Sequence, residues 1–349
     1  MRIVVLGATG NVGTSVLEAL RDETSVDEVV AVARRPAALD YPRTRFVAAD
    51  VARDDLAPIL EGADVVIHLA WPIQPGRDES VTRAVNVQGS ERVFAAAAAA
   101  RVPAVVYASS VGAYAPGPKD RRVDETWPTD GIPTSFYSRH KAEVERSLDR
   151  LERDQPQMRI VRLRPGLIFK REAATEIRRL FAGPLLPSPL VRAKFIPIVP
   201  AHPRLVFQAV HSLDVGRAYA LAALRDVRGA FNIAAEPVLG PRELGEALHA
   251  RPVRVPAWLL RGGAAASYAL RLQPTEPGWV DMGLGVPLMD CTRAQRELGW
   301  SASQTSVDAL LELVAGMGDQ ADFETPPLAR STTGPARWRE LRTGIGRRV

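Results

Sequence analysis

Residues 2–13, RIVVLGATGNVG, decide the fold class of this chain. Arg2–Leu6 is expected to form a short apolar strand, and an amphipathic helix is expected to begin near Val12. Glycines between a strand and a helix let the backbone approach a diphosphate, and the helix N-terminus offers it unpaired N–H groups. A tight turn without a ligand is the competing interpretation. The placement between strand and helix favours a nucleotide site.

The next expected strand, Glu28–Ala33, indicates which nucleotide is bound. An acid at the end of this strand usually holds the ribose 2′-hydroxyl of NAD, whereas a nearby arginine accommodates the 2′-phosphate of NADP. Here Asp27 and Glu28 precede the apolar run, while Arg34 and Arg35 follow it. Two guanidinium groups suit a bidentate phosphate contact, although a solvated basic turn would also contain them. The sequence predicts NADP as the cofactor, with NAD as the alternative.

The first half of the chain alternates strand and helix signals. Further strands are expected at Arg45–Ala48, Asp64–Leu69, Ala104–Ser109 and Arg159–Leu163, separated by helices near Asp54–Glu61, Glu79–Arg101 and Phe136–Arg153. Strands joined by crossover helices form a parallel sheet that is covered on both faces and binds ligands at its carboxyl edge. The predicted fold is α/β, a doubly wound parallel sheet of the Rossmann type with a smaller, loop-rich C-terminal lobe.

The expected division of the chain follows from these signals. Residues 1–165 and 205–235, which end in a strand at Ala230–Ala234, are predicted to form the dinucleotide-binding domain, and residues 166–204 and 236–325 the substrate-binding lobe. Six prolines in residues 166–204 indicate a loop-rich wall over the site. The stretch Pro252–Gly285, with Trp258, Tyr268 and Trp279, is expected to complete the substrate pocket, although ordinary core packing would explain these aromatic residues equally well.

Composition limits the remaining function classes. The chain has 349 residues with 46% hydrophobic content, and its one cysteine, Cys291, excludes an internal disulfide and a multi-cysteine metal site. His202 and His211 lack metal-ligand spacing, so no metal is expected. The first residues already form a strand, and no apolar run approaches the roughly 18 residues of a membrane span. These features predict a cytoplasmic protein with no membrane partner.

The net charge of +5 comes from the C-terminal end of the chain. Residues 326–349 contain six arginines and one acid, so 6 minus 1 accounts for the whole excess. This segment follows the last expected helix, Ser306–Met317, and its prolines and glycines predict a loosely ordered basic tail. A solvated extension is favoured over a nucleic-acid contact, so nucleic acid is not expected as a partner.

Tyr137 and Lys141 stand four residues apart in the stretch YSRHK at 137–141. On a helix, residues at this spacing share one face, so the phenol and the ammonium would lie side by side. Lowering the phenol pKa from about 10 toward roughly 7 requires about 4 kcal/mol from local groups, and a fixed ammonium is a plausible source. Such pairs also occur by chance on solvated helices. The glycine loop and the polar residues at the strand ends favour a functional pair.

Together, the motifs resemble an extended short-chain dehydrogenase/reductase, the group that includes the NAD(P)-dependent epimerase/dehydratase proteins. The resemblance covers most of residues 1–316. It rests on GATGNVG at 7–13, Asp50-Val51, His68-Leu69-Ala70, NVQG at 86–89, Ser109-Ser110 leading to Tyr114, YSRHK at 137–141, Arg164-Pro165-Gly166, VHSLDV at 210–215, FNI at 231–233 and LGW at 298–300.

The resemblance implies a catalytic trio. Tyr137 would be the general acid/base, passing a proton to or from the substrate oxygen while the nicotinamide exchanges a hydride. Lys141 would hold the nicotinamide ribose and lower the pKa of Tyr137. Ser110 would donate a hydrogen bond to the same oxygen, and Ser109 is the alternative because the motif alignment can slip by one residue.

The resemblance also implies binding residues. The predicted cofactor contacts are Gly7, Thr9, Gly10, Asn11, Val12, Gly13, Arg34, Arg35, Asp50, Val51, Leu69, Ala70, Asn86, Ser109, Tyr137, Lys141 and Pro165, and the predicted substrate contacts are Trp71, Ser110, Tyr114 and Gly166. At four positions in these motifs, a structural role is the alternative to a contact with cofactor or substrate. These structural roles are a turn for Asp50, backbone hydrogen bonds for Asn86, core packing for His68 and a first-turn helix role for Asp214.

Departures from the family pattern restrict the substrate. Sugar-nucleotide members typically carry Asn and a Tyr-Gly-Pro run where this chain has RPGLIFK at 164–170, and Trp71 replaces a small residue. These differences favour an NADP-dependent oxidoreductase acting on a small or apolar carbonyl or alcohol. The alternatives are a nucleotide-sugar epimerase or dehydratase that retains NAD(P), and a non-catalytic NAD(P)-binding regulatory protein. Helices at Glu79–Arg101 and Phe136–Arg153 resemble the family's four-helix dimer interface, so a homodimer is expected.

Overall fold

A seven-stranded parallel sheet forms the centre of the molecule. The computed structural model describes residues 1–35, 37, 39–73, 77–174, 176–177, 196–319 and 321–328. The sheet has the order β11-β7-β5-β4-β1-β2-β3. Its strands are β1 (Arg2–Leu6), β2 (Glu28–Ala33), β3 (Thr44–Ala48), β4 (Val65–His68), β5 (Ala104–Ala108), β7 (Arg159–Pro165) and β11 (Gly229–Ile233). The predicted α/β, Rossmann-type fold is confirmed.

The strand order reverses beside β1. From β1 the chain proceeds to β2 and β3 on one side, and then returns to place β4 against the other side of β1. In doubly wound sheets this reversal opens a crevice at the carboxyl ends of the two central strands, where ligands bind. The glycine loop that follows β1 lies at this point.

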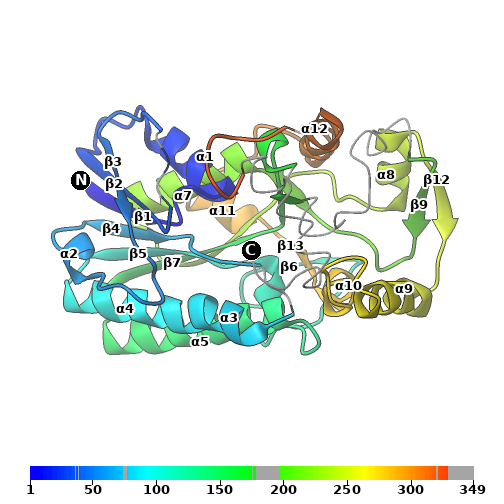
Figure 1. Cartoon of the computed structure of the whole chain (residues 1–349), viewed down its shortest axis with the longest axis horizontal. Coiled ribbons are helices and arrows are strands. Elements are labelled where there is room, and N and C mark those ends of the chain that lie inside the picture. Colours follow the sequence, from blue (N-terminus) through cyan, green and yellow to red (C-terminus); the bar gives the residue numbers. More distant parts are fainter. Residues whose placement is uncertain are drawn as a thin grey trace.

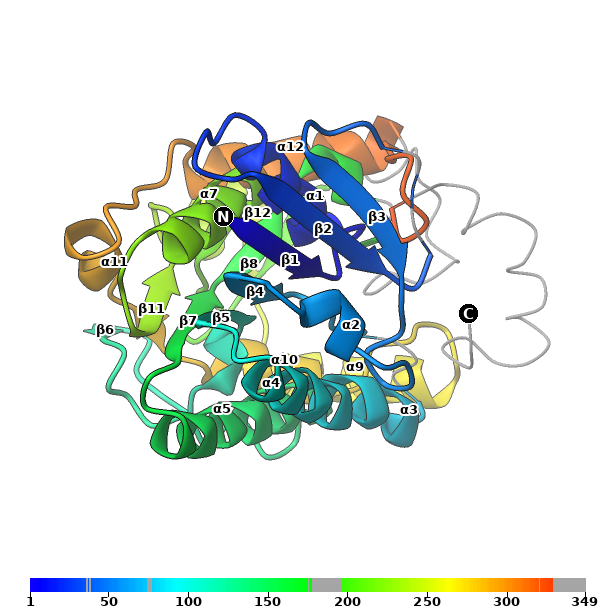
Figure 2. The same cartoon turned by 90° about the vertical axis from the view of Figure 1, so that its left-hand side faces the viewer.

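Helices cover both faces of the sheet, as Figures 1 and 2 show. Helices α1 (Asn11–Leu20) and α7 (Ser212–Leu224) pack on one face. The other face is covered by α2 (Ala57–Leu60), α4 (Ser90–Ala99) and α5 (Phe136–Asp154). The two layers explain why the central strands are apolar on both sides, as parallel sheets require.

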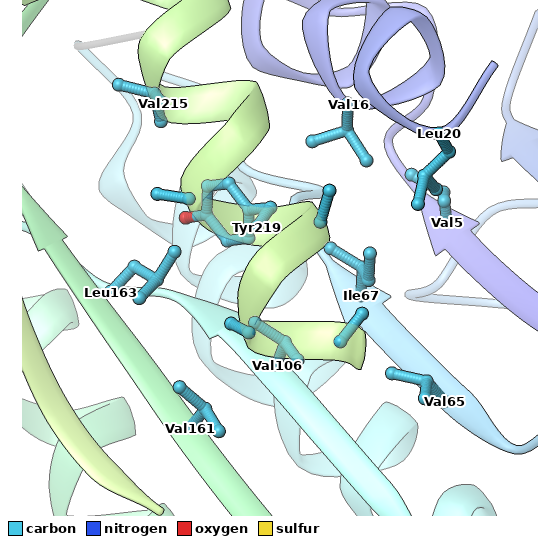
Figure 3. Close-up of a cluster of buried hydrophobic side chains, with 14 of the residues drawn as sticks. Val5, Val16, Leu20, Val65, Ile67, Val106, Val161, Leu163, Val215 and Tyr219 are labelled. Atoms are coloured by element: carbon cyan, nitrogen blue, oxygen red, sulfur yellow. The ribbon is translucent and has the colours of Figure 1, made fainter. Parts of the chain in front are cut away.

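Alternate strand residues supply two separate cores. Val5 and Ile67 face α1 and α7, where they pack around Tyr219 (Figure 3). Val4 and Val66 point to the opposite face and join the core beneath α4 and α5. Burying each such aliphatic side chain contributes about 1.5–3 kcal/mol, so this alternation fixes the register of the strands.

Most of the remaining elements form smaller units beyond the carboxyl edge of the sheet, whereas α11 (Thr292–Arg296) packs against β11. Three two-stranded sheets pair β6 with β13, β8 with β10 and β9 with β12. Their strands are β6 (Arg122–Val123), β8 (Leu167–Phe169), β9 (Ile198–Ala201), β10 (Ala209–His211), β12 (Arg251–Arg254) and β13 (Leu288–Met289). The helices among these elements are η2 (Val111–Ala113), η3 (Arg171–Ala173), α8 (Pro241–Leu248), α9 (Ala257–Ala269), α10 (Gly278–Gly285), α11 (Thr292–Arg296) and α12 (Ser306–Asp319).

Two predicted helices differ from the structure. The expected helix Glu79–Arg101 is divided into α3 (Glu79–Arg83), a π-helical segment η1 (Ala84–Gly89) and α4. The helix expected over Asp54–Glu61 is reduced to α2, which carries Pro58 near its start. Proline lacks the N–H that an interior helical position needs, so the helix cannot begin three residues earlier.

Parts of two predicted segments fall outside the described residues. In the expected loop-rich segment 166–204, the structure describes β8, η3 and β9, whereas residues 178–195 lie outside the description. Residues 329–349 of the expected basic tail lie outside it as well. The first tail residues, by contrast, are packed, since Leu328 is fully buried. The division into two domains stays a prediction.

Candidate active site

The glycine loop after β1 is shaped by close backbone contacts. Gly7 has φ +88°, and a Cβ atom there would lie 2.8 Å from the backbone nitrogen of Ala70, at the end of β4. A Cβ atom on Gly13 would lie 2.3 Å from the carbonyl oxygen of Gly7. Both positions therefore require glycine. The next helix, α1, begins after Gly10 with no side-chain cap, which leaves its positive N-terminal end open to an anion.

A pocket of about 250 Å³ lies beside this loop and continues to the ends of β2 and β3. It brings together many of the predicted residues, among them Gly7, Thr9, Gly10, Arg34, Arg35, Asp50, Val51, Leu69, Ala70 and Trp71. Pro327, from the beginning of the predicted tail, also lines it. The predicted residues Asn11, Val12 and Gly13 lie in the adjoining first turn of α1.

The chemistry of the pocket fits a dinucleotide. The open N-terminus of α1 provides N–H donors for a diphosphate, and Asn11 Oδ1 is a buried acceptor without a hydrogen-bond partner in the described part of the chain. A ribose hydroxyl would satisfy such an acceptor. Arg34 and Arg35 are exposed where the pocket passes the end of β2. Asp50 also performs the turn role, because its Oδ1 accepts the N–H of Ala52 at 3.0 Å.

Helix α5 presents Tyr137 and Lys141 from its first two turns. Its N-terminus is set by Ser135, whose side chain accepts the N–H of Ser138. The Tyr137 ring lies between two indoles, at a centroid distance of 5.9 Å from Trp71 and 5.1 Å from Trp279. The hydroxyl groups of Tyr137 and Ser110 are hydrogen-bonded. Of the two candidate serines, it is therefore Ser110 that meets Tyr137.

Lys141 is almost fully buried, and its ammonium lies over the Trp71 ring. Its Nζ donates to the carbonyl oxygen of Ala108 at 2.6 Å and lies 3.4 Å from the Trp71 ring centroid, but 5.7 Å from the Tyr137 ring centroid. Burial lowers the pKa of Lys141 well below its usual value, and the Glu145 carboxylate opposes this change. Trp71 and Lys141 thus form a cation–π pair at the site.

The expected lowering of the Tyr137 pKa is wrong for this structure. Burial raises the pKa of Tyr137 to about 12, and the hydrogen bond with Ser110 offsets only part of the increase. The physical reason is desolvation of the phenol, whose ring contacts the indoles of Trp71 and Trp279. Tyr137 is therefore neutral at physiological pH in this state.

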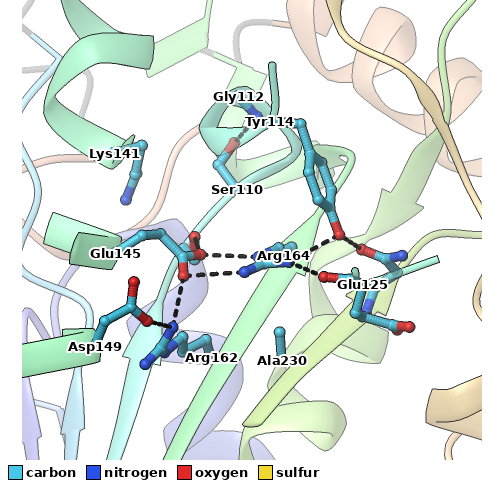
Figure 4. A network of polar contacts seen from close by, with 12 residues as sticks. Ser110, Gly112, Tyr114, Glu125, Lys141, Glu145, Asp149, Arg162, Arg164 and Ala230 are labelled. Carbon is cyan, nitrogen blue, oxygen red and sulfur yellow. Dashed lines mark hydrogen bonds and ion pairs between the residues drawn. The ribbon is translucent and has the colours of Figure 1, made fainter. Parts of the chain in front are cut away.

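Behind this pair lies a buried ionic network that the sequence prediction missed (Figure 4). Glu145 is fully buried on α5, and its carboxylate accepts two hydrogen bonds from Arg164 of β7, at 2.8 and 3.0 Å. Arg162 of β7 lies 3.3 Å away, and the Ser109 hydroxyl donates to the same carboxylate. Two arginines at alternate positions inside β7, a strand paired on both sides, were the sequence signal for a buried carboxylate partner.

This network changes the expectation for two predicted residues. The Ser109 side chain is engaged with Glu145 rather than with the pocket. Tyr114, predicted to contact substrate, is fully buried, donates its hydroxyl to Asn232 at 2.7 Å and accepts from Arg164 at 3.1 Å. The contacts of Tyr114 therefore favour a structural role.

Other predicted residues have packing or positioning contacts. Asn86 donates its side-chain amide to the carbonyl oxygen of Pro72 at 3.0 Å, so it fixes the segment that follows Trp71. Pro165 ends β7, and a Cβ atom on the next residue, Gly166, would lie 2.5 Å from the Gln208 carbonyl oxygen. Gly166 therefore permits a close backbone approach.

His68 and Asp214, for which the sequence left structural roles open, both have structural contacts. His68 is buried and its Nε2 lies 2.9 Å from the Ser90 hydroxyl, while burial lowers its pKa to about 3. Asp214 is fully buried in the first turn of α7, where it accepts hydrogen bonds from Ser303 and Gln304. The Asp214 carboxylate is satisfied within the fold, and His68 is held through its Nε2.

The aromatic residues of Pro252–Gly285 are not equivalent. Trp279 of α10 contacts the Tyr137 ring, as expected for a residue of the site. Tyr268 lies under the Arg77 guanidinium, 3.9 Å from ring centroid to Cζ. Trp258 is 73% exposed, so the expectation that it completes the substrate pocket is wrong. Its place at the start of α9, far from the sheet, explains the difference (Figure 1).

Among the described residues, no group of three or more His, Cys, Asp or Glu side chains is arranged to hold a metal ion. None of the helices in the described ranges has the length and apolarity needed to cross a bilayer.

The sheet, the glycine loop at its reversal point and the Tyr–Lys pair on α5 define a dinucleotide-binding α/β protein of the short-chain dehydrogenase/reductase type. The sequence profile of the NAD-dependent epimerase/dehydratase family matches residues 3–234, and the chain belongs to this family. The resemblance inferred from the motifs is thereby confirmed.

Relatives extend over much of the chain. The uncharacterized Mycobacterium tuberculosis protein Rv0501 is 26% identical over 329 residues, covering 90% of this chain and 84% of that one. The sterol-4-alpha-carboxylate 3-dehydrogenase of Candida albicans is 28% identical over 178 residues, covering 48% of this chain and 50% of that one.

Solved structures show the same fold. The crystal structure of gox2253 has a TM-score of 0.68 and 22% identity, covering 91% of this chain and 98% of that one. MoeE5 in complex with UDP-glucose and NAD has a TM-score of 0.65 and 21% identity, covering 92% and 99%. At this identity the likeness establishes the fold alone.

Proposed function

We propose that this protein is an NADP-dependent oxidoreductase, with NAD as the alternative cofactor, that transfers a hydride between nicotinamide and a small or apolar carbonyl or alcohol. The observation that carries the proposal is the surroundings of Tyr137. Its hydroxyl is hydrogen-bonded to Ser110, and its ring lies between the indoles of Trp71 and Trp279. A proton-transfer pair walled by aromatic rings suits a substrate with a polar oxygen on an apolar body.

Each residue of the trio has a chemical role in this proposal. When bound, the nicotinamide would supply or accept the hydride. The neutral hydroxyl of Tyr137 donates a proton to the substrate oxygen during reduction, and Ser110 donates a second hydrogen bond that stabilises charge on that oxygen. Lys141 holds the ribose, which requires its ammonium to exchange the Trp71 ring for the ribose hydroxyls.

Cofactor choice is assigned to Arg34 and Arg35. Both are exposed, line the pocket and directly follow β2, where the adenosine ribose lies in Rossmann-type folds. A 2′-phosphate would find two guanidinium groups there, whereas the acids Asp27 and Glu28 stand at the opposite end of β2. This arrangement supports NADP over NAD.

The relatives support an apolar substrate in part. The Candida albicans relative is named as a dehydrogenase acting on a sterol carboxylate, and it matches about half of this chain. A sterol is a large apolar alcohol, so its name agrees with the aromatic walls around Tyr137. We extend to this chain only the substrate class, an alcohol or carbonyl on an apolar skeleton.

Replacing Tyr137 by phenylalanine tests the proposal. We expect turnover of NADPH with a carbonyl substrate to fall by about 10²–10⁴, because general acid–base catalysis is lost. Binding should be retained, as measured by the thermal shift with NADPH, since a ligand at about 100 times its dissociation constant stabilises by roughly 2.7 kcal/mol. Tyr41→Phe, on a tyrosine remote from the pocket lining, is the matched control. Unchanged turnover in Tyr137→Phe would refute the proposal.

A second candidate is a nucleotide-sugar epimerase or dehydratase. The solved structures of similar fold favour it, since they include MoeE5 in complex with UDP-glucose and NAD, and a UDP-N-acetylglucosamine 4-epimerase from Methanobrevibacter ruminantium. Such an enzyme retains and regenerates its cofactor. Denaturing the purified protein and identifying released NAD(P) by mass spectrometry, together with conversion of a nucleotide sugar without net NADPH consumption, would replace the first proposal by this one.

A further inference from the structure

Helix α9 presents a large apolar surface to solvent. None of its residues is buried. Trp258 is 73% exposed and Leu259 is 50% exposed, and the neighbouring Leu270 and Leu272 are 69% and 44% exposed. Six of the nine exposed large hydrophobic side chains in the described part of the chain lie on α9, on the three residues that follow it, or on strands β9 and β12. This concentration distinguishes α9 from every other described surface.

The exposed side chains of α9 share one face. At about 100° per residue, the exposed apolar positions fall within an arc of roughly 140° that contains no polar residue. They are Trp258, Leu259, Gly262, Gly263, Ala266, Ala269 and Leu270. A Cβ atom on Gly262 or Gly263 would meet nothing within 4 Å, so the middle of this face is open. We call these seven residues the α9 face.

The flanks of the α9 face are basic. Residues 247–275 contain Arg251, Arg254, Arg261 and Arg271 and no acidic residue. Arg261 pairs with Asp281 at 2.9 Å, whereas the other three arginines are exposed and form no ion pair within the described ranges. An exposed tryptophan, exposed leucines and flanking arginines are the combination that binds the interface of an anionic bilayer.

We propose that the α9 face docks on an anionic lipid surface, with α9 lying in the plane of the interface and the arginines contacting lipid headgroups. This is a peripheral contact, in which no helix crosses the membrane. The sequence-based expectation of no membrane partner depended only on the absence of a membrane-spanning segment. Charge favours lipid over a second copy of this chain, because a two-fold contact would bring like-charged arginines together.

The position of the α9 face suits an apolar substrate. Figure 1 shows α9 beside α10 at the end of the molecule away from β1–β3. Helix α10 places Trp279 against Tyr137, so only one short helix separates the docked surface from the catalytic tyrosine. A substrate dissolved in the bilayer would then reach the site from the membrane side. The docking itself does not depend on the proposed function.

Vesicle binding tests the proposal with the full-length protein. Cosedimentation is measured with vesicles of phosphatidylcholine and phosphatidylglycerol in equal parts, and with vesicles of phosphatidylcholine alone. We expect binding to the anionic vesicles that weakens at high salt, since each arginine near an anionic surface strengthens binding about five-fold. Trp258→Glu combined with Leu270→Glu should reduce binding at least about ten-fold, because two apolar anchors become charges repelled by the lipid.

A matched control tests whether vesicle binding depends on the α9 face or on any exposed leucine. Leu213→Glu changes another exposed leucine, on α7, and should leave vesicle binding within about two-fold of the wild type. Unchanged melting temperatures in all variants show that the fold is intact. The proposal is overturned if the wild type does not sediment with anionic vesicles at low salt, or if the double variant binds as well as the wild type. It is also overturned if light scattering shows a dimer that the double variant dissociates and vesicles bind neither form.

Discussion

Replacing Glu145 by glutamine is expected to destabilise the fold more than any exposed charge change. The carboxylate is fully buried and accepts two hydrogen bonds from Arg164, which is itself 4% exposed. Glutamine keeps the shape of the side chain but removes its charge. The Arg164 guanidinium would then stay in the core without a neutralising partner, and the Ser109 hydroxyl would lose a charged acceptor.

The magnitude follows from this burial. Removing one partner of a buried ion pair costs about 3–5 kcal/mol, mostly because the other charge is left uncompensated. For a chain of 349 residues the entropy of unfolding is about 0.7 kcal/mol/K. Thermal unfolding followed by circular dichroism should therefore show a melting temperature lower by about 4–7 °C at neutral pH.

The matched control is Glu152→Gln on the same helix. Glu152 pairs with Arg162 but its side chain is 36% exposed, so its removal should cost at most about 1 kcal/mol and shift the melting temperature by about 1 °C or less. A shift in Glu145→Gln no larger than that of the control would refute the reasoning, because it would mean that the buried carboxylate does not compensate Arg164.

The difference in stability between the wild type and Glu145→Gln has a defined pH dependence. Burial alone would raise the pKa of Glu145, but Arg164, Arg162 and the Ser109 hydrogen bond outweigh it and lower the pKa below its usual value. A lowered carboxylate pKa contributes stability above the unfolded value of about 4.5 and loses it as pH falls through the folded value. The difference between wild type and variant should persist from neutral pH to about 4.5 and shrink at lower pH.

Three further predictions concern the cofactor and the assembly. Arg34→Ser combined with Arg35→Ser should weaken NADPH binding at least about ten-fold and leave NADH binding within about two-fold, because only the 2′-phosphate contact is removed. Fluorescence titration measures both affinities, and equal losses for NADPH and NADH would contradict the prediction. Gly13→Ala should abolish the thermal shift with either cofactor, because its Cβ would lie 2.3 Å from the Gly7 carbonyl oxygen. Gly283→Ala, where a Cβ meets no atom within 4 Å and the backbone has no positive φ, is the control for general destabilisation by loss of glycine. Light scattering should give the mass of a homodimer, and Ala95→Arg on the exposed side of α4 should halve it; a monomeric wild type would reject the dimer.

The sequence allowed close prediction of the strands. Within the seven-stranded sheet, β1 and β2 begin and end at the predicted residues, and the other five strands differ at one end or both by one or two residues. The six described strands of the two-stranded sheets were not predicted. The central strands are apolar runs, because both faces of the sheet are covered. The same reasoning located α5, which the structure extends by one residue to Asp154.

The arrangement of the site was less predictable. The π-helical segment η1 contains Asn86, whose side chain donates to the Pro72 carbonyl oxygen, a contact between segments that no local pattern encodes. The role of Glu145 required knowing that α5 lies over β7. The exposure of Trp258 required knowing that no described element covers α9. Each depends on tertiary contacts rather than on periodicity.

The surroundings of Tyr137 combine a feature that the sequence predicts with one that depends on tertiary contacts. Its distance in sequence from Lys141 predicted that the ammonium would lower the phenol pKa, and the helix does place both on one face. Yet burial favours the uncharged forms of both Tyr137 and Lys141. The Lys141 Nζ lies over the Trp71 ring. A neutral phenol can donate a proton to a carbonyl oxygen but cannot accept one from an alcohol. In the proposed reaction, the oxidative direction would therefore need a lower pKa of the Tyr137 phenol than burial gives it. A charged Lys141, which the Glu145 carboxylate favours, is the group on this helix face that would lower it.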